Sequence, residues 1–289
     1  MIMAKEGDRL PIVAAIQLFL NANRGSATIP VNGQFDGRTA AAVRNFQDGC
    51  HIDPDGIVGP ETWRRLAMSC GAEVRDIVDI FDPMIVQMQR VAERVGSRPI
   101  TFGGGSNALG WIVPSVAASG VRPGTLALLR ILGHGNYGTQ VIGYGTGCHV
   151  LFQTMRIGQE MPSLHHCAPD QVHATPEEVR QVRQVMEHSG ISFWSVTNPE
   201  VIEALAPLRN YFAPYGSVEM HGCRVGGGAE GPRLLGRLAE LWRVPISGAR
   251  NKQHTVDAVR YHGPVTTICP DRNDVATWAG RLEPVTMSA

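Results

Sequence analysis

The sequence lacks an excess of charge of either sign. It contains 26 Lys and Arg residues and 26 Asp and Glu residues in a chain of 289, so its formal net charge is zero. Domains that bind nucleic acid are usually basic, and anionic membrane surfaces attract clusters of Lys and Arg. The composition therefore predicts no nucleic-acid partner and no partner at a membrane surface.

Long apolar runs are also missing. No stretch of the sequence approaches the roughly 20 apolar residues that a membrane-spanning helix needs. A secretory signal needs an apolar segment of about 7–15 residues behind a basic start, whereas Glu6, Asp8 and Arg9 interrupt the start of this chain. We therefore expect no membrane span and no signal peptide, and we expect synthesis in the cytoplasm.

Cysteines are few and widely scattered. No two of the six have the CxxC spacing of a zinc or redox site, and their positions are 50, 70, 148, 167, 223 and 269. In a chain of this length without a signal peptide, free thiols are expected. One His and Cys cluster could suggest zinc, but its spacing matches no standard finger, so we predict no metal and no cofactor. Its members are Cys148, His149, His165, His166, Cys167 and His173.

Glycine and proline are what the sequence has in quantity. It contains 33 Gly and 19 Pro residues, and only 18% of its residues are charged, which indicates a chain with many turns. Its hydrophobic content of 43% is ordinary for a globular protein. At roughly 100–200 residues per domain, the length predicts about two domains.

Two turns near the N-terminus form an internal repeat. Residues 31–39 (VNGQFDGRT) are echoed by residues 54–62 (PDGIVGPET), with Gly33 and Gly56 separated by 23 positions. Each copy contains an Asn-Gly or Asp-Gly turn and ends in a Thr, Thr39 or Thr62, that can cap a helix. Apolar residues at helical spacing follow both copies, and an amphipathic helix over about 10–21 precedes them. The pattern predicts a compact bundle of about three short helices.

Four motifs follow one another between residues 8 and 68. They are Ile16-Gln17-x-x-Leu20-Asn21, Val31-Asn32-Gly33-x-Phe35-x-x-x-Thr39, Ala42-Val43-x-x-Phe46-Gln47 and Asp55-Gly56-Ile57-Val58-Gly59-Pro60-x-Thr62-Trp63. In this order they resemble the peptidoglycan-binding type 1 domain, with Asp36 standing where the family usually has Gly. The resemblance implies a three-helix fold that binds cell-wall peptide or glycan, with peptidoglycan as the partner.

Individual residues of this module are assigned to its core and turns. We expect Trp63, Phe46 and Leu66 in the core, and Asn32 and Asp55 as turn formers. The pattern does not indicate which residues within 8–68 contact peptidoglycan. After this module (1–70), apolar residues at helical spacing over 71–95 predict a helical linker or the first helix of the next domain (96–289). The glycine-rich segment 103–107 lacks the Lys-Ser/Thr of a phosphate loop, so we expect a simple loop there.

Two apolar segments of the larger domain run into residues that could carry chemistry. A strand is predicted over 125–132, followed by His134, and another over 216–222, followed by Cys223. A glycine-rich turn over 226–231, a helix over 232–242 and a short strand over 244–249 come next. This alternation predicts an α/β domain with a largely parallel sheet. Ligands of such sheets bind outside the carboxyl ends of the strands, where both residues would lie.

His134 and Cys223 have the chemistry of a catalytic pair. A cysteine attacks as a thiolate, and a nearby histidine can take its proton. Adjacent glycines leave backbone N–H groups free to stabilise an oxyanion. The alternatives are a buried structural thiol at Cys223 and a structural His134. His221, which alternates with Cys223 along the strand, is a second candidate base.

The order of a strand ending in His134-Gly135 and a later strand ending in Cys223 resembles the caspase-like cysteine peptidases. A bacterial caspase-like family of uncharacterised function is more similar still, because its Gly-Cys is followed by a glycine-rich turn, a helix and a short strand. The resemblance implies His134 as general base and Cys223 as nucleophile, with the backbone N–H groups of Gly135 and Cys223 as the oxyanion hole. Two departures are Arg224, where the bacterial family often has Asp, and the absence of the caspase Gln-Ala-Cys box.

The sequence therefore predicts a small all-α N-terminal domain joined to a larger caspase-like α/β domain. The leading function is a wall-targeted cysteine hydrolase, in particular a peptidase acting on a peptide or protein substrate. One alternative is a peptidoglycan hydrolase or amidase. Another is a non-catalytic wall-binding component of a phage or injection apparatus. We expect action at the cell wall or periplasm, as a bacterial or phage effector reaching it by lysis or non-classical secretion.

Overall fold

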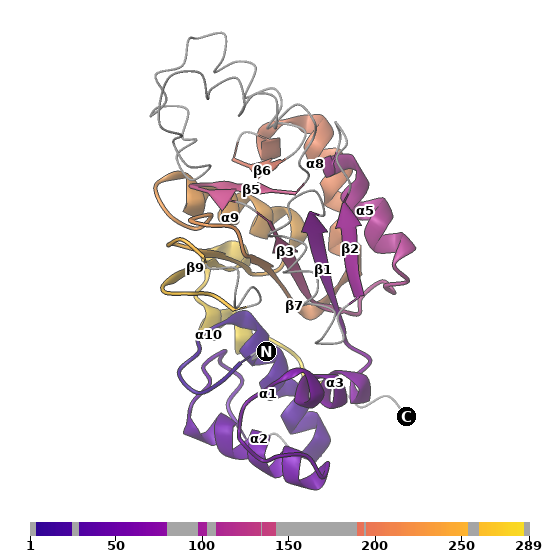
Figure 1. The fold of residues 1–289 in the computed structure, drawn as a ribbon, viewed down its shortest axis with the longest axis vertical. Helices are drawn as coiled ribbons and strands as arrows, with labels where there is room; N and C mark the ends of the chain where they lie inside the picture. Colours follow the sequence, from indigo (N-terminus) through magenta and orange to yellow (C-terminus); the bar gives the residue numbers. More distant parts are fainter. Residues whose placement is uncertain are drawn as a thin grey trace.

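The computed structural model describes most of the 289-residue chain. The described residues are 4–24, 29–79, 98–102, 108–133, 135–142, 190–193, 195–253 and 260–285. They form a helical N-terminal part and a larger part built on a six-stranded sheet, with the helices lying below the sheet in Figure 1. Both predictions of fold class, a helical N-terminal region and a larger α/β region, are confirmed at this level.

Three helices build the N-terminal part. They are α1 (Pro11–Arg24), α2 (Gly37–Gly49) and α3 (Pro60–Ser69). Trp63 and Leu66 are buried as predicted, and Phe46 is partly buried against the same core. Pro60 opens α3 at its first turn, where its missing N–H costs no helical hydrogen bond.

Two buried glutamines account for the internal repeat. The Gln17 side chain accepts hydrogen bonds from the backbone N–H groups of Asn32 and Gly33, at 2.9 and 3.0 Å. Its amide nitrogen donates to Asn32 Oδ1, Gln34 O and Thr39 Oγ1. One amide at the inner face of α1 therefore holds the whole first turn.

Gln47 of α2 does the same for the second turn. Its oxygen accepts from the N–H of Gly56 at 2.9 Å, and its nitrogen donates to Asp55 Oδ1, Ile57 O and Thr62 Oγ1. The two turns have similar sequences because each one forms the same set of hydrogen bonds with its own buried glutamine. Asn32 and Asp55 are turn residues, as predicted.

The predicted helix caps are wrong in one respect. Asp36, not Thr39, caps α2: its carboxylate accepts the N–H of Thr39 at 2.9 Å, and this hydrogen bond lowers the pKa of Asp36. Gly59 takes the corresponding position before α3 without a side-chain bond. The two threonines lie inside the first helical turns because their hydroxyls are needed by the buried glutamines.

The larger part contains a six-stranded sheet in the order β2-β1-β3-β7-β8-β9. Neighbouring strands are parallel except for β9, which is antiparallel to β8. The strands are β1 (Glu73–Asp79), β2 (Arg98–Phe102), β3 (Leu126–Leu132), β7 (Phe212–Met220), β8 (Ile246–Ala249) and β9 (Val265–Ile268). A small second sheet joins β4 (Gly135–Asn136), β5 (Thr139–Val141) and β6 (Gly190–Ser192).

The helix predicted over 71–95 is wrong where it can be compared with the structure. Residues 73–79 form β1, which pairs with both β2 and β3. Ile77 and Val78 are both fully buried although they point to opposite faces, because both faces of this strand are covered. A strand buried on both sides loses the alternation that distinguishes it from a helix. Residues 80–97 and the loop predicted over 103–107 lie outside the described residues.

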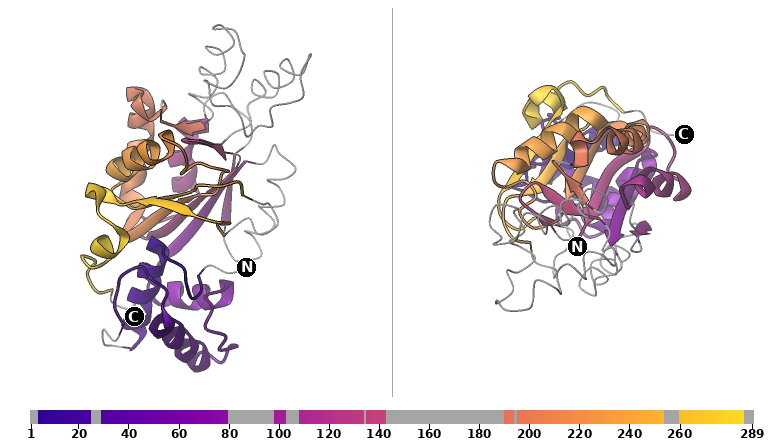
Figure 2. Two further views of the ribbon diagram at one scale, coloured as in Figure 1. Left: turned by 90° about the vertical axis from the view of Figure 1, so that its left-hand side faces the viewer. Right: turned by 90° about the horizontal axis from the view of Figure 1, so that it is seen from above.

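Helices cover one face of the main sheet (Figure 2). They are α5 (Ala108–Ala118), α8 (Pro199–Leu205) and α9 (Glu230–Trp242), with the short turns η2 (Ser195–Thr197) and η3 (Ala206–Tyr211) between or beside them. Leu234, Leu238 and Trp242 of α9 pack with Ile131 and Val218 of the sheet in one apolar cluster. Asn198 caps α8, accepting the N–H of Glu200 at 3.0 Å.

The N-terminal helices pack on the first half of β3 and β7 at the opposite face. Phe19 of α1 meets Tyr215 of β7 edge to face, with ring centroids 5.1 Å apart. Leu128 belongs to the same apolar cluster as the cores of all three helices. The helical part and the sheet therefore share one continuous core.

The last described segment returns to the N-terminal helices. After the turn η5 (Pro270–Arg272), α10 (Val275–Ala279) packs its Trp278 with Ala14 of α1. Arg260 also forms an ion pair with Asp8 at 2.7 Å. In the described ranges, no helix is long and apolar enough to cross a bilayer.

Candidate active site

The carboxyl ends of β3 and β7 lie side by side. The two strands are parallel neighbours, with Ile131 paired to Met220. The N–H of His221 then donates to Ile131 O at 2.9 Å, which carries the pairing one residue beyond β7. The segments that follow these strands, 133–135 and 221–223, therefore start from adjacent points of the sheet edge.

His134 lies outside the described residues, but both of its chain neighbours are described. Gly135 touches the second segment: a Cβ added to Gly135 would lie 2.8 Å from the Cα of Gly222. A Cβ on Gly222 would likewise lie 2.8 Å from the Cα of Gly135. The two backbones are in direct contact, which only glycine permits at both positions.

Gln140 of β5 ties the two segments together. Its side-chain oxygen accepts the N–H of Gly222 at 2.8 Å, while its own strand position pairs with Gly135. Gln140 is fully buried. Sequence reasoning missed this residue, because a glutamine in a three-residue strand carries no signal of its own.

Cys223 is held at its sulfur and through its neighbours. Its Sγ accepts the N–H of Gln253 at 3.2 Å, and its side chain is 8% exposed. The N–H of Arg224 donates to Asn251 O at 3.0 Å. In contrast, no hydrogen-bond acceptor for the N–H of Cys223 is found in the part of the chain that the structure describes. An amide in this state is what an oxyanion hole requires.

The glycine-rich turn after Cys223 is a tightly packed structure. A Cβ on Gly226 would lie 2.3 Å from Gly248 O, and one on Gly231 would lie 2.5 Å from the carbonyl carbon of Gly226. The turn is thereby pressed between β8 and the first turn of α9. The glycines reflect close backbone approach and fix the path of the chain beyond Cys223.

Arg224 lies at the outer side of this edge. Its backbone is left-handed, with φ 58°, and its guanidinium carbon is 5.4 Å from the ring centroid of Tyr137. Tyr137 belongs to the turn between β4 and β5 and is 37% exposed. Arg224, which departs from the bacterial caspase-like pattern, therefore directs its guanidinium to the ring of Tyr137.

His221, the second candidate base, is buried among other partners. Its Nε2 lies 3.0 Å from Glu219 Oε2, and its ring stacks on Tyr261 with centroids 4.4 Å apart. The Tyr261 hydroxyl donates to Ser247 O at 2.8 Å. Burial, together with the Glu219 carboxylate, raises the pKa of Tyr261 well above its usual value. This Glu219–His221–Tyr261 group supports the end of β7 just before Cys223.

A buried ion pair lies deeper in the same sheet face. The Arg130 guanidinium binds Asp76 through two parallel hydrogen bonds, at 2.5 and 2.8 Å, and both side chains are almost fully buried. Arg130 is paired in register with Asp76 on one side and with Glu219 on the other. Sequence reasoning missed this pair, because the two residues are 54 positions apart and meet only through the pairing of β1 with β3.

The predicted metal-like cluster from Cys148 to His173 lies outside the described residues. Within the described ranges, no group of three or more His, Cys, Asp or Glu residues is arranged to hold a metal ion. The four cysteines that the structure describes, Cys50, Cys70, Cys223 and Cys269, are free thiols.

Comparison with known proteins identifies the N-terminal part. Residues 9–66 match the family model described as a putative peptidoglycan binding domain. A curated protein of Kitasatospora aureofaciens, described as an uncharacterized protein in the bpoA1 3′ region, is 39% identical over 64 residues, which are 22% of this chain and 54% of that protein. The chain thus spans about half the length of the curated relative it matches. No solved structure matches the chain.

The N-terminal part of the chain therefore matches a peptidoglycan-binding domain, as the sequence motifs predicted. This match supports the predicted N-terminal domain, and binding of the chain to peptidoglycan stays a prediction. The matched residues end within α3, before the main sheet begins.

Proposed function

We propose that the chain is a wall-targeted cysteine hydrolase that cleaves a peptide bond, with Cys223 as nucleophile and His134 as general base. One observation carries the proposal: the backbones of Gly135 and Gly222 touch at the carboxyl ends of adjacent parallel strands. This contact supports the proposal because Gly135 follows His134, and Gly222 precedes Cys223, in the sequence. The mostly parallel sheet also fits the caspase-like interpretation of the sequence.

The proposed reaction proceeds through a covalent intermediate. His134 takes the proton of Cys223, and the thiolate attacks the carbonyl carbon of the peptide bond. The N–H groups of Gly135 and Cys223 stabilise the oxyanion, for which the N–H of Cys223 is suited because no described residue accepts it. The C–N bond then breaks and the amine leaves with the proton from His134. Water hydrolyses the thioester and restores the thiol.

A matched pair of cysteine variants tests the proposal. The wild-type chain, Cys223→Ala and Cys50→Ala are incubated with a mixed peptide library and with purified wall sacculi. Cys50 is a partly exposed thiol in the wall-binding domain, so its loss should change neither activity. Peptide cleavage that is lost only in Cys223→Ala supports the proposal. Muropeptide release that survives Cys223→Ala would instead favour the alternative of a peptidoglycan hydrolase or amidase.

A second candidate is a non-catalytic wall-binding protein. The burial of Cys223 and its hydrogen bond from Gln253 favour it, because a structural thiol has the same surroundings. Binding of the wild-type chain to sacculi without cleavage of either substrate would support this candidate. Alkylation distinguishes the two further: a nucleophilic Cys223 reacts with iodoacetamide in the folded chain, and a structural thiol reacts only after unfolding.

A further inference from the structure

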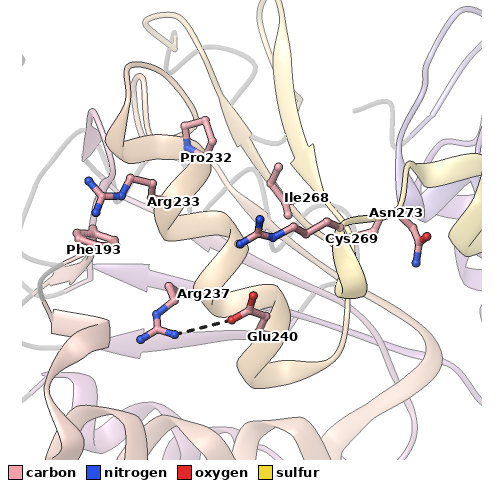
Figure 3. Close-up of a pocket in the computed structure, with 10 residues that line it drawn as sticks. Phe193, Pro232, Arg233, Arg237, Glu240, Ile268, Cys269 and Asn273 are labelled. Atoms are coloured by element: carbon pink, nitrogen blue, oxygen red, sulfur yellow. Dashed lines mark ion pairs between the residues drawn. The ribbon is translucent and has the colours of Figure 1, made fainter.

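A groove of about 430 Å³ lies on the outer side of α9 (Figure 3). One wall is the exposed face of α9, and the other is the end of β9 with the turn η5. Its lining residues are Phe193, Pro232, Arg233, Gly236, Arg237, Glu240, Ile268, Cys269, Arg272 and Asn273. None of them belongs to the wall-binding domain or to the segments around Cys223.

The charge of this groove is positive. Three arginines line it, against a single carboxylate, Glu240. Arg237 and Glu240 form only a loose pair, at 3.8 Å with both side chains about half exposed, so solvent screens it. Asp271 is directed elsewhere, to Arg243 at 3.3 Å. The groove therefore offers more cationic charge than its own carboxylate can neutralise.

Two of the arginines form no ion pair with a described residue. The guanidinium carbon of Arg233 lies over the ring of Phe193, 4.1 Å from its centroid, and a guanidinium held on an aromatic face can still bind an anion through its N–H groups. No described residue forms an ion pair with Arg272. The backbone of Arg272 is left-handed, with φ 55°, and so is that of Asp271, with φ 58°. Consecutive left-handed residues without glycine are strained, and such strain is concentrated at functional sites.

Gly236 lines the groove and has no side chain that would occupy it. It lies in the middle of α9, where glycine costs about 0.5–1 kcal/mol relative to alanine. Packing does not require it, because an added Cβ would meet only Ile268 Cγ2, at 3.9 Å. This contrasts with Gly231 of the same helix, which is pressed against Gly226.

The groove runs between the two functional parts of the molecule. α9 begins seven residues after Cys223, and η5 leads directly into α10, which packs on α1 of the wall-binding domain. A chain lying in the groove would extend from the edge that carries Cys223 toward the domain that holds the wall. Peptides with several carboxylates have the charge that complements Arg233, Arg237 and Arg272.

From these observations we propose that this groove binds an acidic peptide through the guanidinium groups of Arg233 and Arg272. The stem peptides of cell walls carry such carboxylates, so the wall association of the N-terminal domain makes them the natural source. The site goes beyond the proposed hydrolase activity and needs neither Cys223 nor His134.

Binding of a soluble peptide to the full chain tests the site. The probes are an acetylated and amidated peptide with three glutamates, the same peptide with glutamines, and inorganic phosphate, each titrated at low salt and followed by NMR. We expect the glutamate peptide to bind and the glutamine peptide not to bind. Arg233→Gln combined with Arg272→Gln should weaken binding about tenfold or more, because hydrogen bonds between charged groups are lost. Gly236→Leu, which fills the floor, should have a similar effect.

A matched double variant controls for overall charge. Arg122→Gln combined with Arg209→Gln removes two exposed arginines outside the groove and should bind the glutamate peptide as the wild type does. Equal binding by wild type and both groove variants would overturn the site. So would equal affinity for the glutamine peptide. Binding of phosphate but not of the glutamate peptide would overturn the assignment to a peptide. Since Cys223 is intact in every variant, these outcomes are independent of the hydrolase proposal.

Discussion

At the scale of single residues, the structure relies on polar side chains that serve several backbone groups at once. Gln17 and Gln47 each satisfy a complete turn from inside the protein. A buried amide or carbonyl that loses its partner costs about 1–3 kcal/mol. These glutamines therefore act as the centres of the two repeats, and a change at either one affects several hydrogen bonds.

Replacing Gln47 by leucine should lower the free energy of unfolding by about 2–4 kcal/mol. The substitution removes the acceptor of Gly56 N–H and the donor to Ile57 O, and both groups stay buried in the turn. Urea unfolding followed by circular dichroism measures the change. Gln34→Leu is the control, because Gln34 is exposed and should stay within about 0.5 kcal/mol of wild type. A similar small effect at Gln47 would contradict the role assigned to it.

Residues of this kind were only partly predictable. The repeat identified both turns and their glycines, since Asn-Gly and Asp-Gly carry a strong local signal. The pairing of each turn with a glutamine 16 or 9 residues earlier, as in Gly33 N–H to Gln17 and Gly56 N–H to Gln47, depends on the packed fold. Arg130 and Asp76 are 54 residues apart and gave no signal at all. Side-chain contacts between distant strands become visible only once the register is known.

At the scale of elements, the two segments at the sheet edge depend on close backbone contact. Gly135 and Gly222 leave no room for a side chain on either strand end. The sequence predicted β3 to within one residue, because glycines bound its apolar run. The strand predicted over 216–222 exists as β7 over Phe212–Met220, so it begins and ends earlier than predicted. The prediction failed at β1, whose two buried faces remove the alternation of a strand. The neighbours of β1 in the sheet could not be inferred from the sequence pattern.

Gly135→Ala should abolish any hydrolysis that depends on Cys223. The new methyl group would lie 2.8 Å from the Cα of Gly222, so the edge has to spread and the oxyanion hole loses its geometry. We expect a loss of stability of about 1–3 kcal/mol, as for other overpacked sites.

The control for this substitution is Gly49→Ala in α2. An added Cβ meets nothing within 4 Å there, so the helix should gain about 0.5–1 kcal/mol. Peptide cleavage and thermal unfolding are measured for both variants. Full cleavage by a well-folded Gly135→Ala chain would show that the contact with Gly222 is not required for the reaction.

At the scale of the whole molecule, the wall-binding domain and the sheet share their core. Tyr215 of β7 lies against Phe19 of α1, and burial raises the pKa of its hydroxyl to about 12. Burial raises the pKa of Cys269 to about 12 as well, beside α10. Both groups ionise in the unfolded chain at lower pH than in the folded one.

Stability should therefore decrease in alkali. The contribution of Tyr215 and Cys269 to the free energy of unfolding is complete below about pH 9. It is lost as the pH rises toward 12, because the unfolded chain releases these protons first. Tyr215→Phe removes one of the two groups, so its urea midpoint should fall less than that of wild type between pH 9 and 11. Tyr211→Phe, at a site outside this contact, should follow the wild type. A wild-type midpoint that is constant over this range would contradict the assignment.

The short connection between the wall-binding domain and the sheet has a consequence for how the two would cooperate. Only residues 70–72 separate α3 from β1, and α10 closes over α1 from the other end of the sheet. A tethered domain finds its target by searching within the reach of a flexible linker. Here α3 is joined to β1 without such a linker, so under the proposed function a wall polymer bound to the first domain would lie at one fixed distance and orientation from the Cys223 edge. The proposed cleavage would then occur at a fixed distance from the point where the chain binds the wall.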